Sequence, residues 1–523
     1  MTGPGNSTGA RRRLPIGVQT FREIREENCY YVDKTDYLRR LAEGGKHYFL
    51  SRPRRFGKSL FLDTCKELFE GNEPLFEGLD IHPHWDWSIR HPVVRLSFGS
   101  GHFQGPGDLR TEVTDRLKAM EDDAAVTTRP DSVPARLRHL IEWLHQRTGR
   151  RVVVLVDEYD KPILDALDTP ETARANRDFL RGLYAVVKDC DAHIRFTFIT
   201  GVSKFSKVSL FSGLNNLSDI TLDPRYSAVC GYTEEDLDAV FAPELPGLHR
   251  EEIREWYNGY GWLGDDKVYN PFDILLLFDK RRFGAWWFET GRPAFLVETL
   301  MERGVSSVSL ERMLASDALL SQFDVEDMAT EALLFQTGYL TIHAVEPRGG
   351  RTFYRLGYPN REVRQSINES LLNHLAGDST RGEEHSARLY DLLLVNDFAG
   401  LESLFRAFLS GIPYQWHSKN DIASYEGYYA SVFYSCFAGL GLRVIVEDST
   451  SHGRLDMAVL FNGNVYLFEF KVVELTAAGA AMAQLKERGY ADKYRGRGEP
   501  IHLVAVEFSR ESRNIVAFEV EGG

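Results

Sequence analysis

The sequence contains no long apolar run. No stretch approaches the roughly 18 uncharged apolar residues that a membrane-spanning helix needs. The N-terminal arm, Met1–Arg13, is polar and rich in Gly and Arg, and it lacks the apolar core of a signal peptide. These absences argue against secretion and membrane insertion. We expect a disordered arm over residues 1–13, no membrane partner and a cytoplasmic location.

Cysteine is scarce and shows no ligand pattern. The five cysteines, at positions 29, 65, 190, 230 and 436, form no Cys-x-x-Cys pair and no Cys/His spacing typical of a metal site. This pattern disfavours a zinc site and a disulfide framework. It is the usage expected of a protein in a reducing cytoplasm.

An excess of positive charge is also missing. The 62 Lys and Arg residues are outnumbered by 76 Asp and Glu residues, which gives a net charge of −14. This balance argues against a protein that coats polyanions, and any contact with nucleic acid must come from local basic patches. The 523 residues suffice for about two to four globular domains, and the sequence shows no internal repeat.

Short apolar runs alternate with helical patterns in the first part of the chain. The runs are His47–Leu50, Pro92–Phe98, Val152–Val156 and Ile194–Thr200, and the helical segments include Leu60–Phe69 and Ala173–Lys188. Strands separated by helices predict an α/β fold with a mostly parallel, doubly wound sheet. From about Tyr232 the acidic amphipathic segments Thr233–Phe241 and Arg250–Tyr257 predict a mainly helical second domain. The polar segment Gly377–Glu384 predicts a linker to a third domain, which begins with helices and ends in strands.

The first chemical motif follows the His47–Leu50 run. Gly57-Lys58-Ser59 is the ending of a phosphate-binding P-loop, in which Lys reaches the β- and γ-phosphates and the Ser hydroxyl ligates Mg²⁺. Arg52 stands where the pattern requires its first glycine, and Pro53 removes one amide donor. Arginines in this loop can replace the missing backbone dipoles with full charge. The alternative is a basic surface loop in which Ser59 caps a helix.

The residues expected to bind nucleotide on this loop are Arg52, Arg54, Arg55, Phe56, Gly57, Lys58 and Ser59.

A second motif follows the run Val152–Val156. Acids at the carboxyl end of a buried parallel strand lie where ligands bind in open α/β sheets. We expect Asp157 to hold Mg²⁺ through water and Glu158 to orient or deprotonate the attacking water. Thr200 or Ser203, after the next strand, can sense the γ-phosphate. The alternatives are that the two acids cap a helix and that Thr200 and Ser203 simply end a strand.

Six stretches together resemble the prokaryotic AAA-ATPase-like family. They are Leu14–Gly17, Tyr31–Thr35, Arg52–Ser59, Asp157–Pro162, Thr200–Ser206 and Gln336–Leu340. The resemblance covers about Leu14 to Phe518, and the Arg52 replacement looks typical of this family. Members commonly carry a C-terminal PD-(D/E)XK nuclease domain. The resemblance therefore implies a P-loop NTPase domain over 14–231, a helical lid or winged-helix-like connector over 232–375 and an α/β nuclease-like domain over 376–523.

Near the C-terminus the sequence predicts a β-hairpin with a defined register. Asn462-Gly463 separates the runs Leu455–Phe461 and Asn464–Val472, and this dipeptide favours a two-residue type I′ turn. Such a turn pairs Phe461 with Asn464, which places Asp456 opposite Glu469 and Arg454 opposite Lys471 on one face. The expected opposite face carries Leu455, Met457, Val459, Tyr466, Phe468, Phe470 and Val472.

Two opposed carboxylates in a buried sheet repel each other unless a cation lies between them. Oxygen ligands of this kind suit Mg²⁺ or Mn²⁺. Asp456 followed by Glu469-Phe470-Lys471 matches the D…ExK signature, in which the lysine positions the attacking water and stabilises charge on the scissile phosphate. The alternative is a purely structural pair of acids.

Further candidates flank this hairpin. Glu426, near the start of the helical segment Ser424–Leu440, matches the acid often found on the first helix of the nuclease core, although it can also be a helix N-terminal acid. Gln484 is the remaining catalytic candidate. A basic run can contact a nucleic-acid backbone or form a solvated helix face; it comprises Lys486, Arg488, Lys493, Arg495 and Arg497.

These patterns predict an ATPase whose nucleotide state controls a Mg²⁺- or Mn²⁺-dependent nuclease. The expected cofactors are ATP and the divalent ion, and the expected partner is nucleic acid, with DNA favoured over RNA. Homo-oligomerisation stays open, and a role in defence or mobile-element control is an analogy. The competing interpretation is a nucleotide-dependent switch or scaffold whose C-terminal domain binds nucleic acid or protein without cutting it.

Overall fold

The computed structural model describes residues 11–204, 210–211, 214, 216–290, 293–303, 305–320, 329–377, 379–412, 426–450 and 453–523. Residues 1–10 of the expected arm, the end of the Thr200–Ser206 stretch and Ser424 of the expected helix lie outside this range. The chain divides into two compact units. The first comprises residues 1–287 and 314–359, and the second comprises residues 288–313 and 360–523.

The first unit is built on a five-stranded sheet with the order β2-β3-β4-β1-β5, and its paired neighbours are parallel. The strands are β1 (His47–Ser51), β2 (Val93–Ser97), β3 (Val152–Asp157), β4 (Ile194–Gly201) and β5 (Ser218–Asp219). Every residue of β1 and β3 is buried, which explains their continuous apolar sequences. The four expected strands and the α/β fold class are confirmed.

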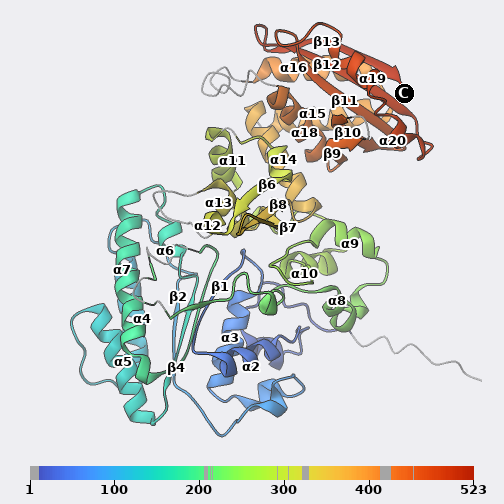
Figure 1. The fold of residues 1–523 in the computed structure, drawn as a ribbon. Helices are drawn as coiled ribbons and strands as arrows, with labels where there is room; N and C mark the ends of the chain where they lie inside the picture. The colour runs from blue at the N-terminus through green and yellow to red at the C-terminus, as the bar shows by residue number, and fades with distance from the viewer. Residues whose placement is uncertain are drawn as a thin grey trace, which may run out of the picture. The chain divides into compact units, whose positions relative to one another are not determined.

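Helices cover both faces of this sheet (Figure 1). Helices α2 (Thr35–Gly44) and α3 (Lys58–Phe69) lie on one face, and α4 (Asp108–Asp123), α5 (Val133–Thr148) and α7 (Pro170–Asp189) lie on the other. The remaining short helices before β5 are α1 (Phe21–Glu26) and α6 (Lys161–Leu164). This is the doubly wound arrangement that the alternating pattern predicts.

The middle segment is mainly helical, as expected, and carries one small sheet. Its helices in the first unit are α8 (Glu234–Val240), α9 (Arg250–Tyr257), α10 (Pro271–Lys280), α12 (Asp317–Leu320) and α13 (Thr330–Thr337). The sheet has the order β6-β8-β7 and consists of β6 (Met313–Ser316), β7 (Thr341–Arg348) and β8 (Arg351–Gly357). The expected turn at 347–351 joins β7 to β8.

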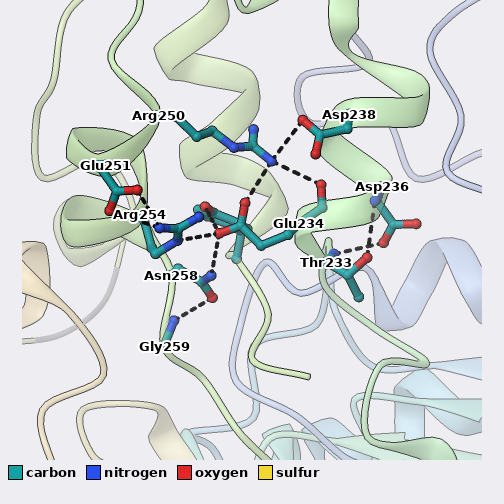
Figure 2. A network of polar contacts seen from close by, with 10 residues as sticks. Thr233, Glu234, Asp236, Asp238, Arg250, Glu251, Arg254, Asn258 and Gly259 are labelled. Carbon is teal, nitrogen blue, oxygen red and sulfur yellow. Dashed lines mark hydrogen bonds and ion pairs between the residues drawn. The ribbon is translucent and has the colours of Figure 1, made fainter. Parts of the chain in front are cut away.

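A polar network centred on Glu234 holds this segment together (Figure 2). Glu234 Oε1 accepts hydrogen bonds from Arg254 Nε at 2.8 Å and Asn258 Nδ2 at 3.1 Å, and its Oε2 forms an ion pair with Arg250 at 2.7 Å. Gly259, beside Asn258, has φ 128°, and a Cβ there would lie 1.9 Å from the carbonyl oxygen of Pro359. The network therefore fixes a tight backbone approach that only glycine tolerates.

The second unit contains the C-terminal sheet, with the order β13-β12-β11-β10-β9. Its strands are β9 (Arg443–Thr450), β10 (Gly453–Phe461), β11 (Asn464–Val472), β12 (Ile501–Ser509) and β13 (Asn514–Gly522). Its helices are α11 (Pro293–Glu302), α14 (Arg361–Ala376), α15 (Ser379–Leu394), α16 (Phe398–Gly411), α18 (Glu426–Gly439), α19 (Ala480–Glu487) and α20 (Asp492–Arg495). Helix α18 packs on β9, β10 and β11, whereas α19 packs on β11 and β12.

Two expectations about the connections need revision. The predicted linker Gly377–Glu384 is wrong, because most of it belongs to α15, whose inward face includes the buried residues Gly382 and His385. The compact units also differ from the expected division at 231 and 375, since residues 232–287 cluster with the parallel sheet and residues 360–375 with the C-terminal sheet. Polar composition predicts exposure, but an amphipathic helix is polar on one face as well.

Within the described part of the chain, no helix combines the length and the apolar composition needed to cross a bilayer. All five cysteines are buried and free of disulfide bonds.

Candidate functional site

The P-loop connects β1 to α3 at the carboxyl edge of the parallel sheet. Gly57, the N-cap of α3, has φ 93°, and no side chain in the described structure caps this helix. The amides at the start of α3 thus stay free to bind phosphate oxygens. Lys58 and Ser59 are the first two residues of the helix, as the motif requires.

Lys58 is buried and folded back onto its own loop. Its Nζ donates to the carbonyl oxygens of Arg52 and Pro53, both at 2.9 Å. Burial lowers the pKa of Lys58, and the charges of Glu158 and Asp157 oppose this effect. The ammonium therefore lies inside the loop, where the oxygens of a bound phosphate would replace the two carbonyl oxygens as its hydrogen-bond acceptors.

The side chain of Arg52 does not face this point, which corrects the expectation that it binds phosphate. Its guanidinium is buried and donates to the carbonyl oxygens of Ser51, Thr221 and Tyr226 at 2.8 to 3.0 Å. It also lies 4.1 Å from the ring centroid of Trp262. Arg52 therefore shapes the loop from within, at the position where the standard pattern has glycine.

Phe56 is likewise a core residue rather than a nucleotide contact. It is fully buried, with edge-to-face contacts to Tyr260 at 4.7 Å and Trp262 at 5.5 Å. Periodicity in the sequence did not single out these two aromatic residues, because they lie about 200 residues further along the chain. Phe56 thus links the P-loop to the loop that follows Gly259.

Arg54 and Arg55 are the arginines of this loop that remain exposed. The carbonyl oxygen of Arg54 accepts a 3.0 Å hydrogen bond from Trp287 Nε1. Arg55 has φ 66° and its guanidinium lies 5.0 Å from the ring centroid of Phe272. Both side chains stay available for an anion, so their role in nucleotide binding remains a prediction.

The two expected acids lie at the end of β3. Asp157 Oδ1 accepts a 2.7 Å hydrogen bond from the hydroxyl of Thr200, because β4 lies between β3 and β1 in the sheet. Glu158 has φ 51°, a left-handed conformation that is rare outside glycine and often found at functional sites. Burial raises its pKa, and Lys58 opposes the rise. The fold thus brings Lys58, Asp157, Glu158 and Thr200 to one edge.

Ser203 does not face a phosphate, which corrects that alternative. Asp160 Oδ2 accepts hydrogen bonds from the amide of Ser203 at 2.6 Å and from its hydroxyl at 2.5 Å. Asp160 is buried, and it also accepts from the amide of Val202 at 3.1 Å. Asp160 therefore anchors the segment after β4, a role that the sequence did not reveal.

In the second unit, the hairpin has the predicted turn, and its ladder keeps the predicted register as far as the Met457–Phe468 pair, short of the expected pair Asp456–Glu469. Asn462 has φ 48° and Gly463 φ 73°, both left-handed as a type I′ turn requires. The paired residues run from Phe461–Asn464 to Met457–Phe468. Beyond them, Asp456 Oδ2 accepts a 2.9 Å hydrogen bond from the amide of Phe470, so a side chain replaces a ladder bond.

This change at Asp456 revises two details of the expected faces. Leu455 packs with Ala458, Val465 and the residues of α19 instead of with Met457. Arg454 is exposed and bonds Glu447 Oε2 at 3.1 Å instead of standing beside Lys471. Strict alternation of faces holds only while the ladder is regular.

Glu469 and Lys471 form the centre of the candidate nuclease site. Lys471 Nζ lies 3.0 Å from Glu469 Oε1. Glu469 is fully buried, and its Oε2 has no hydrogen-bond partner among the residues that the structure describes. A buried carboxylate oxygen without a donor is costly, and a cation would satisfy it. The donor set therefore fits a divalent ion held by Asp456 and Glu469.

Two distant candidates converge on the same carboxylate and lysine. Gln484 Nε2, on α19, donates to Glu469 Oε1 and lies 3.3 Å from Tyr490 Oη. Glu426 Oε2, at the start of α18, lies 3.6 Å from Lys471 Nζ. Side chains from α18, β10, β11 and α19 thus meet at one point, although the described residues contain no ready group of three or more His, Cys, Asp or Glu metal ligands.

The basic run, which begins in the last turn of α19 with Lys486, is largely ion-paired. Lys486 pairs with Glu521 at 2.7 Å and Arg497 with Glu499 at 2.5 Å. Lys493 pairs with the buried carboxylate of Asp448. These contacts favour the alternative of a solvated, internally neutralised face over a backbone-binding surface.

The charge state of Glu469 makes the stability of the protein dependent on pH. Burial, followed by the charge of Asp456, raises the pKa of Glu469 from 4.5 to about 7. The stability contributed by the protonated group is present below 4.5 and is lost as the pH rises through about 7. In EDTA, we expect the Tm of Glu469→Gln relative to the wild type to increase between pH about 5 and about 8. A Tm difference that stays constant over this range would contradict the assignment.

Comparison with known proteins assigns the two parts of the chain to two different families. A family model described as "Predicted AAA-ATPase" matches residues 15–211, and one described as "PD-(D/E)XK nuclease superfamily" matches residues 424–518. A relative from Azotobacter chroococcum mcd 1, named "Uncharacterized protein in vnfD 5'region", is 62% identical over 513 residues, which cover 98% of this chain and 99% of the relative. The chain therefore belongs to the family of AAA-ATPase-like proteins that carry a C-terminal domain of the PD-(D/E)XK nuclease superfamily.

Proposed function

We propose that this protein is an ATP-regulated, divalent-metal-dependent nuclease that hydrolyses phosphodiester bonds in DNA or RNA. The observation that carries the proposal is the buried carboxylate of Glu469, whose Oε2 lacks a hydrogen-bond donor in the described structure and whose Oε1 lies 3.0 Å from Lys471 Nζ. Structural pairs of acids are normally fully hydrogen-bonded. An unsatisfied buried oxygen beside a cationic side chain is the arrangement of a site built for a metal and a phosphate.

Each side chain has a distinct task in this proposal. A divalent ion held by Asp456 and Glu469 would supply Lewis-acid stabilisation of charge on the scissile phosphate. Lys471, held near Glu469, orients a water molecule and offsets negative charge. Gln484 holds the Glu469 carboxylate in place through its hydrogen bond. Glu426 adds a carboxylate 3.6 Å from the ammonium, which helps to keep Lys471 charged.

The N-terminal unit supplies the nucleotide site. The free amides of α3, Lys58 and Ser59 would hold the phosphates and their Mg²⁺. Asp157, positioned by Thr200, would help to hold the Mg²⁺, and Glu158 is placed to accept a proton from the attacking water. The raised pKa of Glu158 suits this role, because a base with a higher pKa accepts a proton more readily.

The test is a plasmid-nicking assay on the full chain, with Mn²⁺ or EDTA and with no nucleotide, ADP or a non-hydrolysable ATP analogue. We expect cleavage that requires the metal and changes at least about fivefold between nucleotide states, the size of a typical coupling energy. Equal rates in all nucleotide states would overturn the regulation. An absence of cleavage in every state would overturn the nuclease proposal and favour a non-cleaving switch.

A further inference from the structure

An open cavity of about 490 Å³ lies at the end of the parallel sheet opposite the P-loop. It is lined by residues at the amino ends of β2, β3 and β4, including His91, Arg151 and Arg195, and by His145 and Arg150 before β3. The P-loop follows the carboxyl end of β1, and Asp157 and Glu158 lie at the carboxyl end of β3, so this cavity at the amino ends of the strands is separate from the nucleotide site. Neither family assignment nor the proposed mechanism gives it a role.

Three arginines around the cavity lack a carboxylate partner in the described structure. Arg150 and Arg151 are exposed and form no ion pair with any described residue. Among the described residues, Arg195 donates a hydrogen bond from Nη2 to the carbonyl oxygen of Ala42, at 3.1 Å, and its guanidinium lies 6.0 Å from the ring centroid of Phe69. In a chain with a net charge of −14, three convergent cations without acids are conspicuous. Like charges held together favour an anion between them.

His91 lies in the same positive field. The pKa of His91 is lowered first by burial and then by the charges of Arg195, Arg150 and Arg151, against a hydrogen bond with the Arg151 carbonyl oxygen. The distance between His91 Nδ1 and the carbonyl oxygen of Arg151 is 2.8 Å, and this hydrogen bond fixes the backbone of Arg151 at the cavity. The carboxylate of Asp86 accepts hydrogen bonds from the amide and the hydroxyl of Ser88, and these bonds, with a smaller contribution from the charge of Arg150, lower its pKa.

We propose that this cavity binds phosphate groups of a nucleic-acid strand. Guanidinium groups match phosphate oxygens in geometry and charge. An enclosed, mostly apolar pocket would suit a small ligand. This cavity is open, and Arg150 and Arg151 are exposed, as contacts with a nucleic-acid backbone require. The inference goes beyond the proposed nuclease function, because it concerns the ATPase-like unit and needs no cleavage.

The first experiment measures binding of a fluorescent single-stranded oligonucleotide to the full chain in EDTA, where no metal-dependent cleavage occurs. Arg150→Gln with Arg151→Gln is compared with Arg116→Gln with Arg138→Gln, which removes two charges that are already paired with Glu112 and Asp189. We expect the Arg150/Arg151 double variant to bind at least about fivefold more weakly than the wild type. The slope of log K against log salt concentration should become shallower by about 1.4, since each phosphate contact on a single strand contributes about 0.7. The control pair should leave both quantities near wild type.

A local reporter separates this cavity from any other binding surface. All native cysteines are buried, so a fluorophore can be attached selectively at Gln146→Cys, an exposed position next to the cavity residue His145 in the chain. The oligonucleotide should change its emission, and the double arginine variant should abolish the change. A response to inorganic pyrophosphate but not to the oligonucleotide would overturn the strand proposal, as would no response to either probe or equal binding by both double variants. If the labelled protein responds to the oligonucleotide but the wild type shows no nicking, the result contradicts the nuclease proposal and leaves the cavity proposal standing.

Discussion

The variant Asp456→Asn is expected to lose phosphodiester cleavage by at least about 100-fold while its C-terminal unit stays folded. The side-chain oxygen of Asn can still accept the hydrogen bond from the amide of Phe470, which Asp456 Oδ2 accepts at 2.9 Å. The substitution removes only the negative charge that the ion requires. The measurements are a nicking assay in Mn²⁺ and thermal unfolding of the same preparation.

A matched control is Glu402→Gln, which removes one negative charge from a partly exposed pair with Arg406 in the same unit. It should cleave at the wild-type rate. Normal cleavage by Asp456→Asn would remove Asp456 from the site, and equal losses in both variants would point to a general charge effect.

Lys471→Met provides the contrasting case at the same carboxylate. Without the ammonium, the buried Glu469 loses its cationic partner, and breaking a buried pair in this way costs about 3 kcal/mol. We therefore expect a lower Tm in EDTA, partial recovery with Mn²⁺ because both acids remain, and no cleavage because the water is no longer oriented. If Mn²⁺ restores the Tm of Lys471→Met but not its cleavage, the lysine acts on the reaction, whereas Asp456 acts by holding the ion. Cleavage at the wild-type rate would exclude Lys471 from the mechanism.

The second large effect is expected from Lys58→Met, which should weaken ATP binding at least about thirtyfold, equivalent to ~2 kcal/mol. The ammonium is buried at the start of α3, and within the described part of the chain its hydrogen bonds go to two backbone carbonyl oxygens of its own loop, so a phosphate can take their place. Methionine keeps the length and the apolar stem of the side chain. Calorimetric titration with ATP in Mg²⁺ measures the loss.

Lys66→Ala is the control, since this residue lies on the same helix and pairs with Glu67 and Glu70 away from the loop. Glu158→Gln should show the complementary behaviour, keeping ATP affinity while slowing turnover by about 100-fold, because it removes only the proton acceptor. Unchanged ATP affinity in Lys58→Met would disprove the P-loop assignment, and wild-type turnover in Glu158→Gln would exclude that residue as the base.

Local patterns predicted the elements that carry the chemistry. The strands His47–Ser51, Val152–Asp157 and Ile194–Gly201 follow from continuous apolar runs, because a strand buried on both faces needs apolar residues throughout. The Asn462-Gly463 turn set the hairpin register, since its left-handed φ angles leave a single pairing. These features depend on residues within a few positions of one another, so they can be inferred without knowledge of the rest of the chain.

Packing between distant segments decided the rest. Arg52 points into the protein because carbonyl oxygens from residues 221 and 226 and the ring of Trp262 surround it, and nothing in its neighbours along the chain indicates this. Gln484 and Glu426 join Glu469 and Lys471 because α19 and α18 pack against the C-terminal sheet from different parts of the sequence. Two ion pairs of the basic run, Lys486 with Glu521 and Lys493 with Asp448, depend in the same way on partners far along the chain, as does the contact of His385 of α15 with Cys436. A side chain's direction is set by the groups that desolvate it and satisfy it, and those groups come together only when the chain has folded.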